Sequence, residues 1–468
     1  MWNFLGYKDH IALIEDSGLQ LSYEELYRET DRLAKAINKR CLVFCLCDNT
    51  IASVLGYAAF VNHRIVPALL SSQLDNELLQ ALIDQYKPTY LWMPKHVRFN
   101  MNDDIVYEAF GYVLVKNKER YQYPLYKDLA LLLTTSGSTG SPKFVRQSYE
   151  NIESNTKSIV EYLQLNSMER PITTLPMHYT YGLSIINTHL WTGATILLTN
   201  KGLMQKEFWY FFKEYQATSF GGVPYTYEML SKLRFFSMEL PSLRTMTQAG
   251  GKLTTELHEK FAEFASDTGR KFVVMYGQCE ATARMGYLPP EKAVEKKGST
   301  GIAIPGGKFR LIDVDGKDIN SPYVTGELVY EGANVTLGYA ERIEDLAKGD
   351  ERQGVLVTGD MARFDEDGYY YIVGRKKRFL KIFGNRVNLD EVDRLIKGRF
   401  EIEATCAGVD DKMHIFLTDE AYSESVKGFV AEKTGLHTSA FHMIIVDEIP
   451  KNDSGKVKYS ELEKYYEV

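Results

Sequence analysis

The sequence lacks long apolar runs and an excess of positive charge. No stretch approaches the roughly 18 uncharged apolar residues that a membrane-spanning helix needs, so we expect no integral membrane segment. Residues 1–10 also lack the basic start and the apolar core of a secretory signal. We therefore predict a cytoplasmic protein. Lysine and arginine number 55 against 62 acidic residues, a net charge of −7, which argues against a nucleic-acid partner because such binding depends on neutralising phosphates.

Cysteine is scarce as well. Five cysteines in 468 residues do not make a disulfide framework. Cys41, Cys45 and Cys47 lie close together, but only His63 is near enough in sequence to add a ligand, and a metal site needs more. We interpret these three as small buried hydrophobic residues on a core strand.

The chain contains the material of an ordinary globular protein. Hydrophobic residues make up 44% and charged residues 25%, and the length predicts two or three domains. Ser22 begins a capping box that predicts a helix reaching Ile37, and residues 51–61 also favour a helix. Buried strands are expected at 42–46, 129–134, 194–198 and 271–275.

Strands and helices in alternation predict an α/β fold with largely parallel sheets. From about residue 309 to 374, alternating residues and turn signals indicate an antiparallel β region, and a small α+β segment follows. We predict a large N-terminal domain of mixed and parallel sheets, with a β-rich subdomain, over residues 1–374. A small α+β domain over residues 375–468 would complete the chain.

The most informative stretch is 131–143, LLLTTSGSTGSPK. A buried strand here runs into glycines and hydroxyls and ends at Lys143, a composition that suits an anion cradled by backbone N–H groups. It is not a Walker A loop, because Pro142 stands where Walker A needs glycine. It is not a nucleophile elbow either, because it does not match G-x-S-x-G. By itself, it fits a phosphate-binding loop and a plain Ser/Gly turn equally well.

Further motifs along the chain favour the phosphate loop. Together with the 131–143 stretch, these motifs resemble those of the adenylate-forming ligases and occur in the same order. This superfamily comprises acyl-CoA synthetases, peptide-synthetase adenylation domains and firefly luciferase. The further motifs are 175–183 (LPMHYTYGL), 248–253 (QAGGKL), 275–280 (MYGQCE), 358–360 (TGD), 374–375 (GR), 381–387 (KIFGNRV) and 450–456 (PKNDSGK). The resemblance extends from about residue 20 to about residue 460.

The resemblance implies that an acid and ATP form an acyl-adenylate and pyrophosphate, and that a thiol then displaces AMP. The first step needs cations and hydrogen-bond donors rather than a protein nucleophile. Glu280 would bind Mg²⁺, which one or two carboxylates and substrate phosphates suffice to hold. Lys456 would bridge the carboxylate and the α-phosphate. The phosphate loop would comprise Thr135, Ser136, Gly137, Ser138, Thr139, Gly140 and Lys143. The adenosine would be bound by Gly250, Gly251, Tyr276, Gly277, Asp360, Arg375, Lys381 and Arg386.

The same resemblance implies that the small domain is mobile and turns about a hinge near Lys377. The loop around Gly384 would then replace Lys456 and form the tunnel for the thiol, where a side chain would block the pantetheine arm. His178 would lie at the acyl pocket. No acid stands near it to pair with an α-ammonium group, so a plain fatty or aryl acid is expected rather than an amino acid. The pocket wall would comprise Tyr179, Tyr181, Gly222, Val223, Ala249 and Met275.

Two positions depart from the family pattern. Cys279 stands where a threonine hydroxyl usually contacts a phosphate, and a thiol is a weaker donor. Arg378 stands after the hinge where many relatives carry an acid. The leading hypothesis is an acyl-CoA synthetase that uses ATP, Mg²⁺ and coenzyme A. One alternative is a ligase that loads an acyl or peptidyl carrier protein, and the other is a catalytically silent nucleotide-binding relative.

Overall fold

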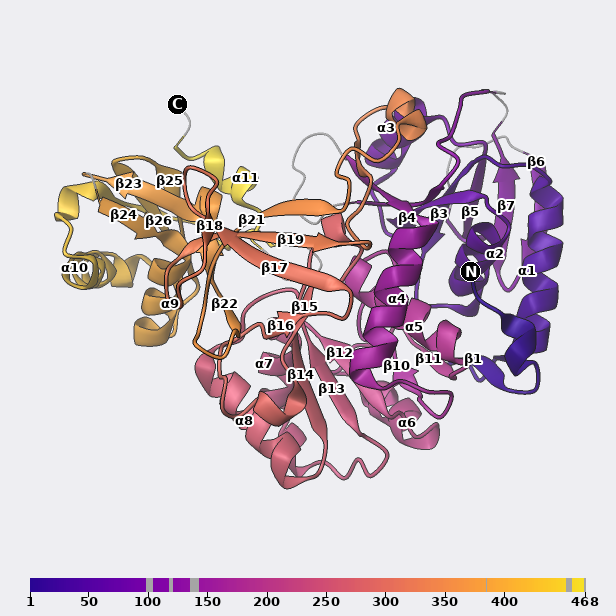
Figure 1. Ribbon diagram of the computed structural model, residues 1–468, viewed down its shortest axis with the longest axis horizontal. Coiled ribbons are helices and arrows are strands. Elements are labelled where there is room, and N and C mark those ends of the chain that lie inside the picture. The colour runs from indigo at the N-terminus through magenta and orange to yellow at the C-terminus, as the bar shows by residue number, and fades with distance from the viewer. Residues whose placement is uncertain (98–103, 118–120, 135–142, 384, 452–456, 467–468) are drawn as a thin grey trace. The chain divides into compact units, whose positions relative to one another are not determined.

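The computed structural model describes residues 1–97, 104–117, 121–134, 143–383, 385–451 and 457–466 (Figure 1). These residues divide into two compact units. The large unit comprises Met1–Phe309 and Tyr330–Leu356, and the small unit comprises Arg310–Val329 and Val357–Val468. Each unit is described by itself. The division at residue 374 and the hinge at Lys377 stay predictions.

The first sheet of the large unit has nine strands. Its central pairs are parallel, as the alternation of strands and helices predicts. The order is β16 (Ile302–Ala303), β15 (Gly286–Tyr287), β14 (Lys271–Tyr276), β13 (Thr245–Gln248), β12 (Ser219–Gly222), β10 (Pro171–Ile172), β11 (Ile196–Leu198), β1 (Ile11–Glu15) and β2 (Gln20–Ser22). The strand expected at 194–198 begins only at Ile196, because the N–H of Ala194 bonds to His189 O at the end of the preceding helix.

The second sheet of the large unit has eight strands and is mixed. The order is β20 (Gly338–Ala340), β9 (Phe144–Ser148), β8 (Leu129–Thr134), β4 (Val66–Ser71), β3 (Leu42–Cys47), β5 (Tyr90–Pro94), β7 (Tyr112–Lys116) and β6 (Asp104–Ala109). Strand β8 has the predicted bounds. Cys45 and Cys47 lie buried on β3, and Cys41 lies buried just before it, which confirms their reading as core residues.

Eight helices belong to the described residues of the large unit. They are α1 (Tyr23–Ile37), α2 (Ile51–Asn62), α3 (Asn76–Tyr86), α4 (Tyr149–Leu163), α5 (Thr180–Thr192), α6 (Lys206–Glu214), α7 (Pro224–Lys232) and α8 (Thr255–Asp267). The Ser22 side chain accepts from Glu25 N, and the predicted capping box is present. Helix α2 is buried at every position from Ile51 to Val61, because its side chains share one core with strands of both sheets. Helices α4 and α5 lie side by side (Figure 1).

Strand β9 begins immediately after Lys143 and is held by a distant part of the chain. Its Arg146 is fully buried and lies opposite Gly338 of β20. The guanidinium donates to the carbonyls of Tyr339 at 2.9 Å and Leu337 at 3.0 Å, and it pairs with Glu351. These bonds fix the start of the chain that leaves the 135–142 segment.

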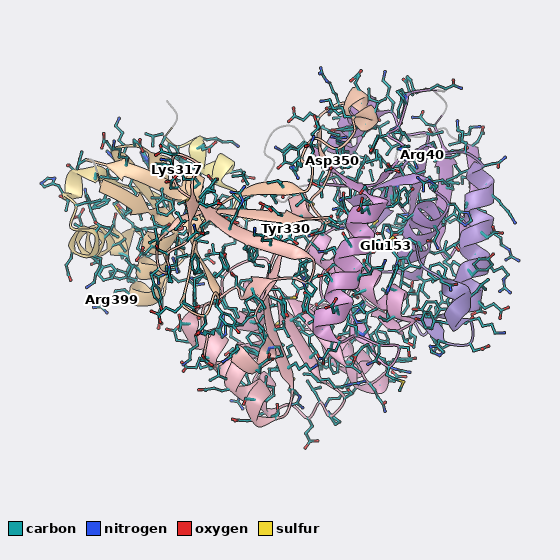
Figure 2. All side chains as sticks on the ribbon, in the orientation of Figure 1. Arg40, Glu153, Lys317, Tyr330, Asp350 and Arg399 are labelled. Atoms are coloured by element: carbon teal, nitrogen blue, oxygen red, sulfur yellow. The ribbon has the colours of Figure 1, made fainter. Side chains whose placement is uncertain are left out.

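A five-stranded sheet has the order β18 (Asp318–Ile319), β17 (Gly307–Ile312), β19 (Gly326–Gly332), β21 (Val355–Phe364) and β22 (Tyr370–Arg375). The pairs β17–β18 and β21–β22 are antiparallel, as the turn signals predict. Tyr330, labelled in Figure 2, is buried at the end of β19 and donates to Asn334 Oδ1 at 2.8 Å.

The C-terminal part of the small unit is α+β, as expected. It contains the hairpin β23 (Phe379–Ile382) and β24 (Asn385–Asn388), and a sheet of β25 (Ala404–Val409), β26 (Lys412–Leu417) and β27 (Phe441–Ile445). Its helices are α9 (Leu389–Phe400), α10 (Ser423–Thr434) and α11 (Tyr459–Glu463). No helix among the described residues is long and apolar enough to cross a membrane.

Candidate active site

The predicted adenine-binding residues lie at the carboxyl ends of neighbouring parallel strands. Strand β13 ends at Gln248, just before Gly250 and Gly251, and β14 ends at Tyr276. The two strands are paired in register, with Gln248 opposite Val274. In α/β sheets, the carboxyl edge of the strands is where ligands bind. The structure thus brings both segments to one edge.

Two glycines at this edge are required by their surroundings. Gly250 has a φ of 84°, a conformation that favours glycine, and a Cβ there would lie 2.7 Å from the Tyr179 hydroxyl. A Cβ on Gly277 would lie 1.7 Å from the Ala283 carbonyl oxygen. Gly277 therefore permits the close turn that carries the chain from β14 into the segment of Glu280.

Glu280, Tyr339 and Lys143 form one polar cluster. The Tyr339 hydroxyl donates to Glu280 Oε1 at 2.7 Å, and Lys143 Nζ lies 3.9 Å from the centroid of the Tyr339 ring. Burial, together with the Glu280 charge, raises the pKa of Tyr339 well above its usual range. The phenol thus stays protonated and acts as a donor to the carboxylate.

Arg352 holds the same cluster in place through the backbone of Glu280 and the ring of Tyr339. Its Nη1 donates to Glu280 O at 3.0 Å and to Thr336 Oγ1 at 2.6 Å, and its guanidinium lies 4.7 Å from the Tyr339 ring centroid. Thr336 N also donates to Glu280 O at 3.0 Å. The backbone of Glu280 is therefore fixed by groups more than fifty residues away in the chain.

The donor set at Glu280 fits Mg²⁺. Its carboxylate is a hard oxygen ligand, only half-buried, with one oxygen held by Tyr339. The described residues contain no group of three or more His, Cys, Asp or Glu side chains able to form a complete metal cage. Mg²⁺ needs none, since it is commonly held by one or two carboxylates and substrate phosphates.

His178 lies half-buried directly before α5, which begins at Thr180. The residues that follow it join an apolar cluster, as the sequence predicts for a pocket wall. Five of the six predicted wall residues belong to this cluster. They are Tyr179, Tyr181, Val223, Ala249 and Met275. The sixth, Gly222, ends β12, and a Cβ there would lie 2.8 Å from the Thr226 methyl group.

Cys279 lies close to the end of β8. Its Sγ is 3.9 Å from the Thr134 carbonyl oxygen, a long and weak contact even for sulfur. Thr134 is the last described residue before the phosphate-loop segment. Cys279 therefore stands where the resemblance places a hydroxyl donor, with a poorer donor in its place.

The predicted ribose-binding pair is found in the small unit. Asp360 and Arg375 are opposite each other on β21 and β22, and Arg375 Nε lies 2.6 Å from Asp360 Oδ1. Asp360 is buried, whereas the Arg375 side chain is 55% exposed. Lys381 and Arg386 are likewise opposite each other on β23 and β24. The structure thus places all four residues in the small unit, and it pairs the side chains of Asp360 and Arg375.

Several predicted site residues lie outside the described residues. They are Thr135, Ser136, Gly137, Ser138, Thr139, Gly140, Gly384 and Lys456. Their proposed roles stay predictions from the resemblance.

Sequence reasoning missed four residues that the structure makes prominent. Tyr339 and Arg352 carry no local signal, because their partner Glu280 is distant in the chain. Arg378 was given no role, yet it is buried and pairs with Asp390 at 2.8 Å and Asp393 at 2.6 Å. Its signal was the spacing of these two acids, which lie three residues apart near the start of α9. The fourth, Arg284, follows the Glu280 motif by four residues.

The family model described as AMP-binding enzyme matches residues 2–340. The chain belongs to the AMP-binding enzyme family. The recognition of adenylate-forming ligases in the sequence is confirmed, as is the expectation of an enzyme of the AMP-forming acid–thiol ligase type at the level of the family.

Known proteins similar to this AMP-binding enzyme include CoA ligases. Oxalate–CoA ligase of Arabidopsis thaliana is 29% identical over 71% of this chain and 66% of its own length. Peroxisomal OPC-8:0-CoA ligase 1 of Arabidopsis thaliana is 28% identical over 98% of this chain and 91% of its own. The 2-succinylbenzoate–CoA ligase of Bacillus velezensis is 26% identical over 96% and 94%.

Solved structures confirm the α/β fold of this AMP-binding enzyme. O-succinylbenzoate CoA synthetase (MenE) of Bacillus subtilis, in complex with its acyl-adenylate, superposes with a TM-score of 0.80 at 21% identity and covers 99% of this chain and 98% of its own. The same relative has been solved with ATP and a magnesium ion. At this identity, the likeness shows the fold.

Proposed function

We propose that this protein is an ATP-dependent carboxylic acid–thiol ligase that makes acyl-CoA. The observation that carries the proposal is the Glu280–Tyr339–Lys143 cluster beside the carboxyl edge of β13 and β14, in a chain of the AMP-binding enzyme family. A carboxylate for a divalent ion and a lysine for phosphate then belong to one cluster, and the carboxylate follows Tyr276, which is expected to bind adenine, by four residues.

The first half-reaction joins the acid to the α-phosphate. A carboxylate oxygen of the acid forms a bond to the α-phosphorus, the bond to the bridging oxygen breaks, and pyrophosphate leaves with its electron pair. Lys143 adds positive charge where the polyphosphate is expected. Glu280 would hold Mg²⁺, which supplies further charge stabilisation to the phosphates. Lys456 would neutralise the approach of two anions.

The second half-reaction transfers the acyl group. A thiolate attacks the acyl carbon, a carbon–sulfur bond forms, and AMP leaves. Gly384 would leave room for the pantetheine arm after the small domain has turned about Lys377. Asp360 and Arg375 would bind the ribose hydroxyls, and Lys381 and Arg386 would add polar contacts to the nucleotide. The substrate would be a fatty or aryl acid, which the apolar cluster around Tyr181 and Met275 supports.

A measurement of pyrophosphate release tests this proposal. Purified protein with ATP and Mg²⁺ is supplied with short, medium, long-chain and aryl acids, with and without coenzyme A. Acid-dependent release with accumulation of AMP and acyl-CoA is expected. Release without free thioester would instead support a carrier protein as acceptor. ATP binding without release for any acid would contradict the proposal and favour a silent relative.

A further inference from the structure

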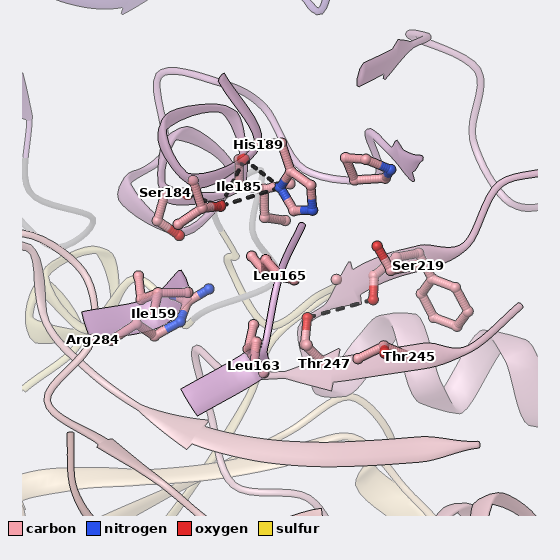
Figure 3. A pocket seen from close by; sticks show the side chains of 14 residues that line it. Ile159, Leu163, Leu165, Ser184, Ile185, His189, Ser219, Thr245, Thr247 and Arg284 are labelled. Atoms are coloured by element: carbon pink, nitrogen blue, oxygen red, sulfur yellow. Dashed lines mark hydrogen bonds between the residues drawn. The ribbon is translucent and has the colours of Figure 1, made fainter. Parts of the chain in front are cut away.

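A small cavity lies in the large unit between helices α4 and α5 and strands β12 and β13. Figure 3 shows it from close by, with Arg284 and His189 on different sides of it. Its volume is about 30 Å³. The lining residues are Ile159, Leu163, Leu165, Pro171, Ser184, Ile185, Thr188, His189, Ser219, Phe220, Gly221, Thr245, Thr247 and Arg284. Leu163 and Ile185 also belong to the apolar cluster of Tyr181 and Met275, so the cavity adjoins the predicted acyl pocket.

Arg284 brings a positive charge into this apolar surrounding. The residue is only 3% exposed. Its Nε lies 3.3 Å from the Met275 sulfur, and its guanidinium carbon lies 3.9 Å from the centroid of the Tyr181 ring. Among the residues that the structure describes, no Asp or Glu lies within ion-pair distance of it. A buried charge without a counter-charge is expensive, and proteins normally pair one.

The position of Arg284 is nevertheless well fixed. Its carbonyl accepts from Asn155 Nδ2 and from Asn334 Nδ2, each at 2.9 Å, and its N–H donates to Asn155 Oδ1 at 3.3 Å. The backbone is thus held by two buried amides from α4 and from the segment after β19. With its backbone held in this way and its guanidinium packed against Met275 and Tyr181, Arg284 is suited to receive a ligand.

The remaining lining adds no charge that could compensate Arg284. No lining residue is acidic. Burial lowers the pKa of His189 to about 4, so its ring is neutral at pH 7. Its Nδ1 lies 2.7 Å from Ile185 O, and its buried Nε2 has no hydrogen-bond partner in the described structure. The cavity therefore combines one cation with one neutral acceptor, a site of net charge +1.

We propose that the acid activated by this enzyme carries a second carboxylate, and that Arg284 receives it. This inference rests on the proposed function and replaces its fatty or aryl monocarboxylic acid with a short dicarboxylic acid, aliphatic or aryl. A guanidinium matches a carboxylate with two parallel hydrogen bonds. A cavity of about 30 Å³ accommodates a group of a few atoms rather than a long chain. Arg284 would then determine specificity, because the monocarboxylic analogue would leave its charge uncompensated.

Matched pairs of acids test the proposal. Butyrate is compared with succinate, pentanoate with glutarate, and benzoate with phthalate, by kcat/KM for pyrophosphate release. The wild-type enzyme is expected to prefer the diacid of at least one pair by tenfold or more. In Arg284→Met, that ratio should fall by about thirtyfold or more, the loss typical of removing one partner of a buried charge pair. Arg284→Lys keeps the charge but loses the two parallel N–H donors of the guanidinium, so its diacid-to-monoacid ratio should lie between those of the wild type and Arg284→Met.

Arg244→Met is the matched control, because the Arg244 side chain is 52% exposed and its Nη1 lies 3.8 Å from Glu169 Oε1. Its diacid preference should equal that of the wild type. If Arg284→Met does not fold, diacid-induced shifts in the Tm of wild type and Arg284→Lys, measured with AMP and without catalysis, replace it. A monoacid preference in every pair, or an unchanged ratio in Arg284→Met, would overturn this inference alone. If no monoacid and no diacid gave pyrophosphate release, the proposed function would be overturned as well.

Discussion

The hydroxyl of Tyr339 donates to Oε1 of Glu280 across 2.7 Å, although 59 residues separate the two in the chain. The bond holds one oxygen of a carboxylate that is otherwise half-exposed. It therefore fixes the direction in which the other oxygen points. Because burial and Glu280 keep the pKa of Tyr339 high, the phenol remains a donor throughout the range in which proteins are active.

The first prediction concerns this pair. Glu280→Gln removes the charge that would hold Mg²⁺, so pyrophosphate release should fall about a hundredfold or more, as when one electrostatic group is removed from an active site. Tyr339→Phe keeps the carboxylate but no longer fixes its orientation. Pyrophosphate release should then fall about tenfold, the loss expected from one hydrogen bond to a charged group. Magnesium titrations should show a higher requirement in both variants.

Tyr210→Phe is the matched control for the phenol, because Tyr210 is 67% exposed on helix α6. It should leave pyrophosphate release unchanged. Wild-type activity in Glu280→Gln would exclude Glu280 from the site.

The second prediction separates the two half-reactions. Lys456→Ala should abolish acyl-AMP formation and leave transfer from supplied acyl-AMP to coenzyme A nearly intact, because the lysine would act only on the first step. Gly384→Leu should do the reverse, since a side chain would block the thiol. Rapid-quench assays of each half-reaction provide the measurement. Equal loss of both steps in Lys456→Ala would contradict the turning of the small domain.

The third prediction concerns His189 and pH. Burial lowers its folded pKa from 6.5 to about 4, so the unfolded chain binds more protons between these values. The contribution of His189 to the free energy of unfolding should therefore be fully present above about pH 6.5 and should be lost as the pH falls toward 4. That loss amounts to about 3 kcal/mol. Urea unfolding of wild type and His189→Gln at several pH values should show a steeper decline in the wild type.

An identical pH dependence in His189→Gln would show that the ring is not buried in its neutral form.

The fourth prediction uses Gly277. A Cβ at this position would lie 1.7 Å from Ala283 O, so Gly277→Ala must displace backbone and should cost about 1–3 kcal/mol or more of the free energy of unfolding. Gly428 lies within α10 with no atom within 4 Å of such a Cβ. Gly428→Ala should instead stabilise by roughly 0.5–1 kcal/mol. Denaturant unfolding measures both, and a neutral Gly277→Ala would contradict the close turn.

Much of the fold follows from local patterns. Strand β8 has its predicted bounds because its apolar run is bounded by turn residues, and α1 begins at Ser22 because the capping box is a local signal. The motifs around Glu280 and Asp360 were likewise visible in the sequence.

Other features depend on tertiary contacts and could not be predicted in this way. Tyr339 reaches Glu280 only because β20 pairs with β9. Arg284 gives no local sign of burial, since an arginine four residues after a motif is normally exposed. Only the packing of Met275 and Tyr181 around it reveals an uncompensated charge.

The anchoring of β9 by Arg146 has a consequence for synthesis. The strand that follows Lys143 obtains its outer neighbour, β20, and the carbonyls that satisfy Arg146 only after about 190 further residues have been made. Pairings of such long sequence separation form late, because the intervening loop must be closed first. A nascent chain that stops short of β20 would leave a buried guanidinium without acceptors. The ribosome must therefore release most of the large unit before the strand that follows the predicted phosphate loop is fully paired.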